Sequence, residues 1–401
     1  MTGTTTETSR KSMSGRLPAG VYLLGFCLFA MGSAEFLLAG VLPAVAADLD
    51  VSLPSAGYLI TAFALGVVIG GPPFAVLSLR WPRRTALMAA QGVFAASIAA
   101  GLLGDYTVLL LTRAVAGVAY AGFFAVATVT AISLVNSDRN ARASGVVVSG
   151  LSVAMVAGGP AGTLLSHFTQ WRGGFWAVVA LTLAGIVGCL LMIPNANPGH
   201  ASAARPTVSQ ELAAIRDPRL WGIWAITILT TAAYMVTYNY LAAMLSDITR
   251  LMEAWIPAVL ALFGIGAFIG LSVGGRISDR RPHAAMLSGA AAIAILSAGL
   301  ALAIHQSRAV APTVFLLGIA AFVLNPALYG RVFALAAHAP TLAGATTVSA
   351  FQLGISITPA LAGIVLTQGV GLTVVCVVGA VLAISAIPLI LVDRAHEGRR
   401  P

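Results

Sequence analysis

Long runs of apolar residues recur along the chain and are separated by short polar segments. They cover residues 19–43, 54–77, 85–103, 107–135, 143–166, 174–193, 220–244, 254–275, 284–304, 312–335, 344–366 and 371–392. A helix of roughly 20 apolar residues crosses about 30 Å of hydrocarbon. Strands of a membrane β-barrel would be about ten residues long and would alternate in polarity. The pattern therefore predicts an all-α membrane protein with twelve transmembrane helices.

The composition excludes a soluble enzyme. Hydrophobic residues make up 59% of the 401 residues and charged residues only 9%, whereas a soluble domain carries about 25% charged residues. The sequence has no GxxxxGK[ST] motif and no cluster of polar catalytic residues. The three cysteines, Cys27, Cys189 and Cys376, fall inside apolar runs, and the six histidines are scattered. We therefore expect no enzymatic activity, no metal site and no cofactor.

The basic residues indicate how the helices are oriented. Of the 22 lysines and arginines, 17 lie in the terminal segments and in the loops on the side that holds residue 1. Loops rich in lysine and arginine stay in the cytoplasm, so both termini are predicted to be cytoplasmic. The net charge of +9 is explained by this topology, and nucleic acid is not expected as a partner.

The chain divides into two similar halves. Residues 194–219 form the longest polar segment between apolar runs, and six runs lie on either side of it. Three pairs of positions recur across this segment at almost the same offset: Arg80 and Arg280, Pro82 and Pro282, Pro160 and Pro359. Such recurrence indicates a duplicated unit. We predict two pseudo-symmetric six-helix halves around a site near the middle of the membrane, with the chain divided into an N-terminal tail (1–18), a first half (19–193), a cytoplasmic central loop (194–219), a second half (220–392) and a C-terminal tail (393–401).

Glu35 is the one acidic residue that the pattern places inside an apolar run. A charged side chain there costs roughly 2.5–3.5 kcal/mol on insertion scales, and Glu35 lies about 12 Å from the end of its run, at about 1.5 Å per residue. Arg113 lies at nearly the same depth and is the expected partner, unless its long side chain extends to the outer interface. A nearby arginine favours the ionised carboxylate and burial favours the protonated one, so Glu35 with Arg113 is predicted to couple transport to protons.

Two helix faces flank these charges. At helical spacing the fourth run presents Arg113, Gly117, Tyr120 and Phe124, and the first run presents Leu28, Met31, Glu35 and Leu38. Such stripes are typical of ordinary helix packing, but beside two buried charges we interpret them as the lining of a cavity. Tyr238 and Asn239 in the seventh run correspond to the first run under the repeat, the alternative being an aromatic belt at the interface. The predicted substrate contacts are Leu28, Met31, Tyr120, Phe124, Tyr238 and Asn239.

In combination these features resemble the major facilitator superfamily. The fifth run contains Gly150, Gly158, Gly159, Pro160 and Gly162, and small residues let membrane helices approach closely. This segment is similar to the antiporter motif of the twelve-span drug:proton antiporters. The segments GSAEFLLAGVLPAVAADLDVS, QWRGGFW and FQLGISITPALAG resemble the chloramphenicol-efflux and arabinose-type exporters of that family. The resemblance covers about residues 19–392 and implies a monomer in the plasma membrane of a bacterium.

The resemblance also implies gating loops on the cytoplasmic side. The loop after the second run keeps Arg80 and Arg84 but has Leu79 in place of the family's acidic residue. The loop after the eighth run keeps Gly275, Asp279 and Arg280. Any clasp that depends on this carboxylate should therefore form at the second loop. Gln352 stands where this branch usually has asparagine and is a further substrate contact that the resemblance implies.

The sequence thus predicts a proton-coupled antiporter that exports small amphipathic compounds, such as chloramphenicol, by alternating access. Its partners would be the substrate, protons and the lipid bilayer. Efflux of sugars or nucleosides is the alternative within the superfamily, but such sites would carry more Asn, Gln and carboxylate side chains. A channel is the alternative outside it, and two repeated halves with one buried acid suit alternating access better.

Overall fold

The computed structural model describes residues 17–78, 81–136, 139–194, 217–336 and 340–397. Within these ranges all regular structure is helical, as predicted. The helices are α1 (Ala19–Asp48), α2 (Leu53–Ser78), α3 (Arg83–Leu103), α4 (Tyr106–Ser133), α5 (Asn140–Val153), α6 (Gly159–Met192), α8 (Pro218–Asp247), α9 (Ile256–Ser278), α10 (Pro282–Ala303), α11 (Ser307–Val323), α12 (Asn325–Leu335), α13 (Pro340–Ser356), α14 (Thr358–Leu366) and α15 (Val374–Glu397). A π-helical turn, η2 (Ala154–Gly158), joins α5 to α6, and a short 3-10 helix, η4 (Glu253–Trp255), precedes α9.

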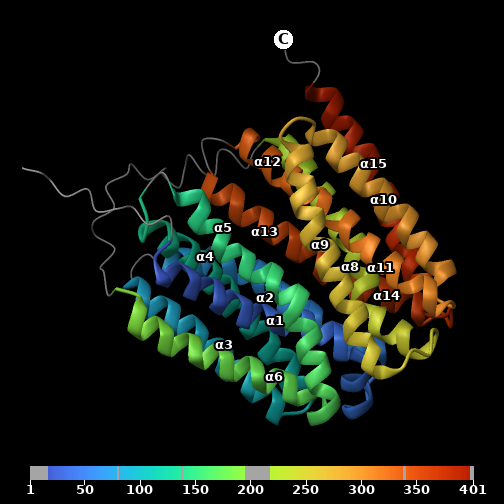
Figure 1. The fold of residues 1–401 in the computed structure, drawn as a ribbon, viewed down its shortest axis with the longest axis horizontal. Coiled ribbons are helices and arrows are strands. Elements are labelled where there is room, and N and C mark those ends of the chain that lie inside the picture. The colour runs from blue at the N-terminus through green and yellow to red at the C-terminus, as the bar shows by residue number, and fades with distance from the viewer. Residues whose placement is uncertain (1–16, 79–80, 137–138, 195–216, 337–339, 398–401) are drawn as a thin grey trace, which may run out of the picture.

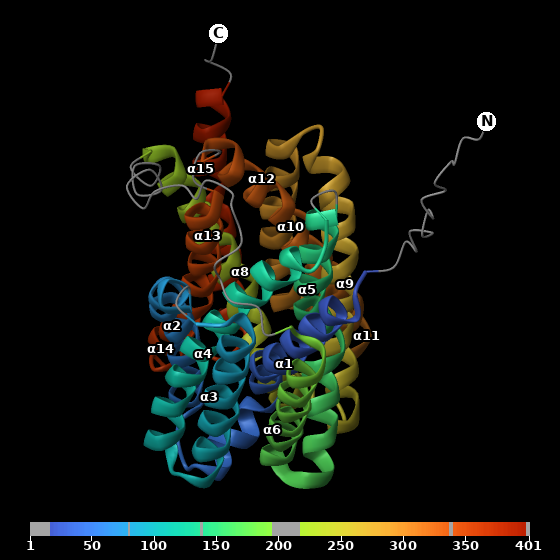
Figure 2. The ribbon, with the colours of Figure 1, turned by 90° about the vertical axis from the view of Figure 1, so that its left-hand side faces the viewer.

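The helices gather into two groups (Figures 1 and 2). Helices α1–α6, coloured blue to green, lie on one side in Figure 1, and α8–α15, coloured yellow to red, lie on the other. The groups meet where α1 packs against α8 and where α2 packs against α13 and α14. Helix α1 also contacts α2, α4, α5 and α6. This central place explains why α1 is buried along most of its length.

Eleven segments of the described residues are long and apolar enough to cross a membrane. The longest, Arg142–Met192, has 51 residues and would measure about 76 Å at about 1.5 Å per residue, more than twice the thickness of the hydrocarbon. Gln170 interrupts it with a φ of 63° and a ψ of 168°. The break falls between the apolar runs 143–166 and 174–193. The count of twelve spans stays a prediction, and this break supports it.

The same close helix contact occurs in both groups. Between α2 and α4, Gly66 lies against the Ala114 carbonyl, Gly70 against Val118, and Gly117 against the Phe63 carbonyl. Between α9 and α11, Gly266 lies against the Phe315 carbonyl, Gly270 against the Ile319 carbonyl, and Gly318 against the Phe263 carbonyl. Residues of α9 follow those of α2 by 200 positions, and residues of α11 follow those of α4 by 201. The correspondence supports the predicted duplication with residues other than the loop motifs.

Two predicted spans are bent, although each still counts as one segment that could cross a membrane. The run 312–335 forms α11 and α12, with a bend at Leu324, and the run 344–366 forms α13 and α14, with a turn at Ile357. Pro326 and Pro359 follow these breaks, since proline removes a backbone donor and clashes with the preceding turn. The final helix continues to Glu397, into the segment 393–401 that the sequence assigns to the C-terminal tail, and the position of that boundary stays a prediction. The last turn of this helix is polar, which is why the apolar pattern stopped at 392.

Candidate functional site

Glu35 lies inside the bundle on α1, with 8% of its surface exposed. The helices around α1 shield the carboxylate from the surroundings. Its Oε1 atom accepts a hydrogen bond of 3.3 Å from Nε2 of Gln352 on α13. The bond therefore joins the two groups of helices. The other amide atom, Gln352 Oε1, is buried and has no hydrogen-bond partner among the described residues. A buried polar atom in this situation is available to a ligand or a proton donor.

Arg113 is 2% exposed, but in the described ranges no ion pair joins it to Glu35, so the predicted direct pair is not formed. Its Nη1 donates to the Ala34 carbonyl oxygen at 3.3 Å and its Nε to the Leu59 carbonyl oxygen at 3.4 Å. The guanidinium carbon also lies 4.7 Å from the centre of the Phe63 ring. Neighbouring side chains on a helix point about 100° apart. Arg113 therefore approaches α1 on the side of Ala34, while Glu35 points toward α13.

A small cavity adjoins Arg113. Its volume is about 10 Å³, and it is lined by Leu38, Leu59, Ile98, Leu102, Leu109, Thr112, Arg113, Trp171 and Phe175. A space of this size holds about one water molecule, whereas drug-sized ligands occupy pockets of roughly 300–1,000 Å³. The surroundings of Arg113 are thus close-packed, and this cavity is not a substrate site.

The predicted cavity face of α4 packs mainly against α2. Phe63 of α2 lies under Arg113, its carbonyl contacts Gly117, and its ring centre is 5.6 Å from that of Tyr120. Ordinary helix packing, the alternative considered from the sequence, therefore accounts for Arg113 and Gly117. The Tyr120 hydroxyl reaches past Phe63 to α1, where a Cβ atom on Gly32 would lie 3.9 Å from it. Phe124 is half-buried and packs against the apolar core.

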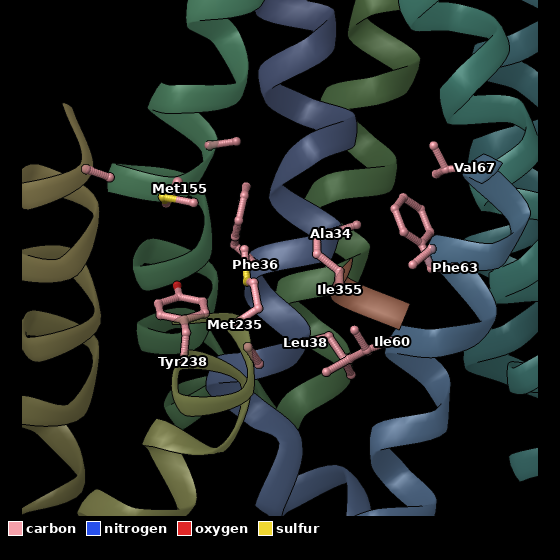
Figure 3. Packing of buried hydrophobic residues seen from close by; sticks show 14 of the residues in the cluster. Ala34, Phe36, Leu38, Ile60, Phe63, Val67, Met155, Met235, Tyr238 and Ile355 are labelled. Carbon is pink, nitrogen blue, oxygen red and sulfur yellow. The ribbon is translucent and has the colours of Figure 1, made fainter. Parts of the chain in front are cut away.

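The other predicted substrate contacts occupy different surroundings. Leu28 and Met31 are fully buried on α1. Tyr238 packs against Phe36, the residue after Glu35, with ring centres 6.4 Å apart, and Figure 3 shows both rings beside Met235 and Met155. Asn239 Nδ2 donates to Thr358 Oγ1 at 2.9 Å, so Asn239 faces α14. The role of these residues in substrate binding stays a prediction.

Two tyrosines outside the predicted set belong to the surroundings of Glu35 and Tyr120. Tyr234 is on α8 and Tyr329 is on α12. The hydroxyls of Tyr120 and Tyr234 lie within electrostatic range of both Glu35 and Tyr329. Tyr329 follows the break at Asn325-Pro326, and interrupted membrane helices commonly line binding sites. The Asn325-Pro326 pair is the signal in the sequence that could have pointed to Tyr329, and the predicted substrate contacts did not draw on it.

The glycines of the fifth run pack against α1 on both sides of Glu35. A Cβ atom on Gly150 would meet the Gly25 carbonyl, and one on Gly158 would meet the Ser33 hydroxyl. The contacts continue past Glu35, where a Cβ atom on Gly159 would lie 2.8 Å from Phe36 Cβ and one on Gly162 would lie 2.8 Å from Leu37 Cδ1. Pro160 directly follows the π-helical turn η2, in the first turn of α6. This segment therefore fixes the position of the part of α1 that carries Glu35.

The predicted gating residues lie at the ends of helices. Arg84 is in the first turn of α3, and Gly275 is in the last turn of α9, four residues before Asp279. Asp279 and Arg280 are exposed, and the Asp279 carboxylate makes no ion pair in the part of the chain that the structure describes. Arg80 lies outside the described residues. Within the described ranges, no clasp forms at the second loop in this conformation.

Known proteins with similar sequences are membrane transporters. The family described as Major Facilitator Superfamily matches residues 24–359. The chain is 38% identical over 356 residues to a chloramphenicol resistance protein of Streptomyces lividans, covering 88% of this chain and 91% of that protein. It is 31% identical over 370 residues to the inner membrane transport protein YdhP of Escherichia coli, covering 92% and 94%. A probable sugar efflux transporter of Mannheimia succiniciproducens is 28% identical over 376 residues, covering 92% and 93%.

Solved structures share the fold. The nucleoside transporter NupG matches with a TM-score of 0.74 at 14% sequence identity, and the match covers 94% of this chain and 98% of NupG. A peptide transporter matches with a TM-score of 0.75, also at 14% identity, covering 95% of each chain. At this level of identity the likeness shows a common fold, while the substrates of the two proteins differ.

Proposed function

Because the chain belongs to the major facilitator superfamily and is a multi-pass membrane transporter rather than an enzyme, we propose that it is a proton-coupled antiporter exporting small amphipathic compounds such as chloramphenicol. The observation that carries the proposal is the buried Glu35 carboxylate, hydrogen-bonded across the two groups of helices to Gln352. Buried ionisable residues in transporters commonly lie on substrate or proton pathways.

The two protonation states of Glu35 make different bonds to Gln352. The ionised carboxylate only accepts, and it accepts from Gln352 Nε2. A protonated carboxyl group can also donate, and the nearby acceptor without a partner is Gln352 Oε1. Proton binding therefore changes a contact between α1 and α13. A ligand shifts a conformational equilibrium only by interacting differently with the two states, and this contact supplies such a difference.

Arg113 would supply a fixed positive charge beside the proton site. It bonds to the carbonyl of Ala34, the residue before Glu35. In this position it would favour the ionised carboxylate against the opposing effect of burial. Its close packing against Phe63 and Leu59 would keep the charge at one place while Glu35 gains and loses its proton.

The character of the side chains around Glu35 supports an amphipathic substrate. Leu28, Met31, Tyr120, Phe124 and Tyr238 are the predicted contacts. Tyr234 adds an aromatic ring near the carboxylate, and Tyr329 adds one near Tyr120 and Tyr234. Aromatic rings stack on a planar group such as a nitrophenyl ring, and Gln352 Oε1 can accept from a substrate hydroxyl or amide. Similarity to the chloramphenicol resistance protein supports the same class of substrate.

Sugar or nucleoside efflux is the second candidate. Buried polar atoms without partners in the described residues include Thr231 Oγ1, Asn325 Oδ1 and Gln352 Oε1, which could bind hydroxyl groups. Relatives named as probable sugar efflux transporters support this alternative. The two candidates predict different competitors: unlabelled nucleosides or pentoses should block chloramphenicol export only if the site accepts polar substrates.

The orientation follows from the basic loops. We place the protein in the bacterial plasma membrane as a monomer. Both termini lie in the cytoplasm in this proposal, because 17 of the 22 basic residues then lie on the cytoplasmic side. The name of the Escherichia coli relative, an inner membrane transport protein, supports this location.

The test is export of labelled chloramphenicol from membrane vesicles, driven by an imposed pH gradient. Glu35→Gln keeps the shape of the side chain but cannot cycle a proton, and we expect gradient-driven export to fall at least about tenfold. Membrane levels should stay normal, because removing a buried charge removes a desolvation cost. Glu35→Asp should retain part of the activity. The matched control is Glu253→Gln, at a carboxylate whose side chain is 79% exposed, and it should behave as wild type. Full gradient-driven export by Glu35→Gln would contradict the proposal.

A further inference from the structure

Four ionisable side chains from three helices meet at one end of the second group of helices. His283 is in the first turn of α10, Arg331 is on α12, and Asp393 and Glu397 lie one turn apart on α15. Asp393 accepts from Arg331 Nη2 at 2.8 Å and Nε at 3.1 Å. Glu397 Oε1 accepts from Arg331 Nη1 at 2.7 Å. Arg331 thus binds both carboxylates with three N–H groups and ties α12 to α15.

His283 lies between the same two carboxylates. Its Nε2 is 2.8 Å from Asp393 Oδ2, and its Nδ1 is 3.2 Å from Glu397 Oε2. A neutral imidazole carries one N–H group and one lone pair, whereas the imidazolium carries two N–H groups. Only the protonated ring can therefore donate to both carboxylates. Proton loss would place a lone pair against a carboxylate oxygen and leave two negative charges facing one arginine.

Three members of the cluster are buried among the helices, and the fourth, Glu397, is exposed to water. His283, Arg331 and Asp393 are each 9% exposed, whereas the Glu397 side chain is 46% exposed. Protons can reach the ring along the Glu397 carboxylate.

The remaining charged groups at this end do not pair with His283 in the described ranges. They are Arg276 of α9, Asp279, Arg280 and Arg281 of the turn that follows it, Asp217 and Arg219 at the start of α8, and Arg394 and His396 of α15. Helix α11 carries its charged residue, Arg308, at its opposite end. Among the described residues, the charged groups in contact with the His283 ring are therefore Asp393 and Glu397, and Arg331 binds both of these carboxylates.

Arg331 connects this cluster to the central site. It lies on α12, a helix of 11 residues that the break at Leu324 and Pro326 separates from α11. Tyr329, two residues before Arg331, lies within electrostatic range of Tyr120 and Tyr234 beside Glu35. Because Tyr329 and Arg331 are on the same short helix, a change in the contacts of Arg331 with α15 can shift Tyr329.

We propose that His283, Asp393 and Glu397 form a second proton-binding site, facing the cytoplasm, that controls the position of α12. With His283 protonated, the cluster is neutral and holds α10, α12 and α15 together. With His283 neutral, the exposed Glu397 carboxylate leaves the ring, Arg331 loses one of its partners, and α12 is freed at this end. The effect on transport rests on the proposed function and orientation, whereas the movement of α12 does not.

Spin labels can test the movement directly in the purified full chain. With Cys27, Cys189 and Cys376 replaced, labels at the exposed positions Ala334 of α12 and Ala395 of α15 report the distance between the two helices. We expect one narrow distance distribution at about pH 6 and a broader, longer one at about pH 8. His283→Gln should give the same distribution at both values. A wild-type distribution that ignores pH, or a His283→Gln variant that keeps the change, would overturn the proposal.

Two controls separate the cluster from general effects of pH. His396→Gln removes an exposed histidine one residue from Glu397 and should leave the pH response intact. Labels at Leu302 and Val377, exposed positions at the opposite ends of α10 and α15, should show no change. Loss of the response in His396→Gln, or an equal change at Leu302 and Val377, would contradict the assignment to His283.

Transport then distinguishes this proposal from the proposed function. With the outer pH held constant, export by wild type should depend on cytoplasmic pH, and His283→Gln should flatten that dependence. Glu35→Gln should lose gradient-driven export yet keep the change of the α12–α15 distance with pH. A pH-dependent distance together with normal export by Glu35→Gln would refute only the coupling role of Glu35. A pH-independent distance together with lost export by Glu35→Gln would refute only the second proton site.

Discussion

Arg113 shows how a full charge is tolerated within apolar helices. Its two carbonyl acceptors, on Ala34 and Leu59, lie in helix interiors and offer a second lone pair in addition to the one used within the helix. The Phe63 ring covers one face of the guanidinium, and a desolvated contact of this kind contributes about 2 kcal/mol. Glu35, close by on α1, supplies the opposite charge. Arg113 is therefore a structural residue as well as an electrostatic one.

We expect Arg113→Ala to lower the stability of the protein more than Glu35→Gln does. The substitution leaves the buried Glu35 carboxylate without a nearby cation and the Ala34 and Leu59 carbonyls without their donor, and an uncompensated buried charge costs about 3–5 kcal/mol. Arg113→Lys should fall between, because an ammonium keeps the charge but lacks the planar face and the fork of donors. The double variant Arg113→Ala with Glu35→Gln should recover part of the loss. The measurement is the amount of monodisperse protein that remains after heating in detergent.

The control for this series is Arg308→Ala, at an exposed arginine near the start of α11. It should melt like wild type. If Arg113→Ala also melts like wild type, or if the double variant is no more stable than Arg113→Ala, the two charges do not compensate each other in the folded protein.

At the scale of helices, the lengths of the apolar runs predicted where the spans lie, but not how each helix is rotated about its own axis. The runs found the helices because a membrane span needs about 20 apolar residues. The same reasoning placed Glu35 and Arg113 at one depth, and both are buried. It could not show that Arg113 meets the Ala34 side of α1, because that depends on the rotation of two helices against each other. The repeat in the loops, in contrast, anticipated the recurring glycine contacts of α2 with α4 and α9 with α11.

The pattern of apolar runs could not predict a cluster of charged residues that come from distant segments of the chain. His283, Arg331 and Asp393 come from three helices, and Asp393 follows the end of an apolar run. His283 and Asp393 alone looked like boundary residues, and Arg331 fell inside the apolar run 312–335 without an evident partner. The break before α12 was visible as Asn325-Pro326, but proline in a membrane helix is compatible with both a kink and a straight passage. Tertiary contacts decide between these outcomes, and one sequence does not contain them.

Gly150 offers the sharpest test of the packing of α5 against α1. A methyl group on Gly150 would collide with the Gly25 carbonyl. A Cβ atom and a backbone carbonyl cannot turn away as a flexible side chain can, so helices α1 and α5 would have to separate. Gly150→Ala should therefore cost about 1–3 kcal/mol through overpacking and displace the part of α1 that carries Glu35. We expect less folded protein in the membrane and weaker export per molecule.

The matched control lies on the same helix. Gly145 is exposed, and a Cβ atom there would have no neighbour within 4 Å. Gly145→Ala should be neutral or slightly stabilising, since alanine is favoured over glycine in helices by about 1 kcal/mol. Equal behaviour of the two variants in expression and melting would show that the close approach of α5 to α1 does not matter.

For the molecule as a whole, contacts between the two groups gather on the side predicted to face outward. Thr61 Oγ1 of α2 donates to the Ser356 carbonyl oxygen of α13 at 2.8 Å, and Gly57 of α2 lies against Tyr240 and Pro359. On the side predicted to be cytoplasmic, Asp279 is exposed and has no ion pair within the described residues. Alternating access requires the opposite arrangement in another state, with the outer contacts open and the inner side closed.

Asp279 is the residue that can close the inner side, because Leu79 in the first loop has no charge to offer. We expect Asp279→Asn to lower export while membrane levels and melting stay normal, since the carboxylate has no partner to lose in the present conformation. An exposed ion pair contributes up to about 1 kcal/mol, so the rate should fall by up to about fivefold, and less in high salt, where exposed charges are screened. Asp247→Asn, at an exposed acid on the opposite side, should export like wild type. Unchanged export by Asp279→Asn would show that the inner side closes without this carboxylate, and an equal loss in both variants would show that the effect comes from surface charge in general.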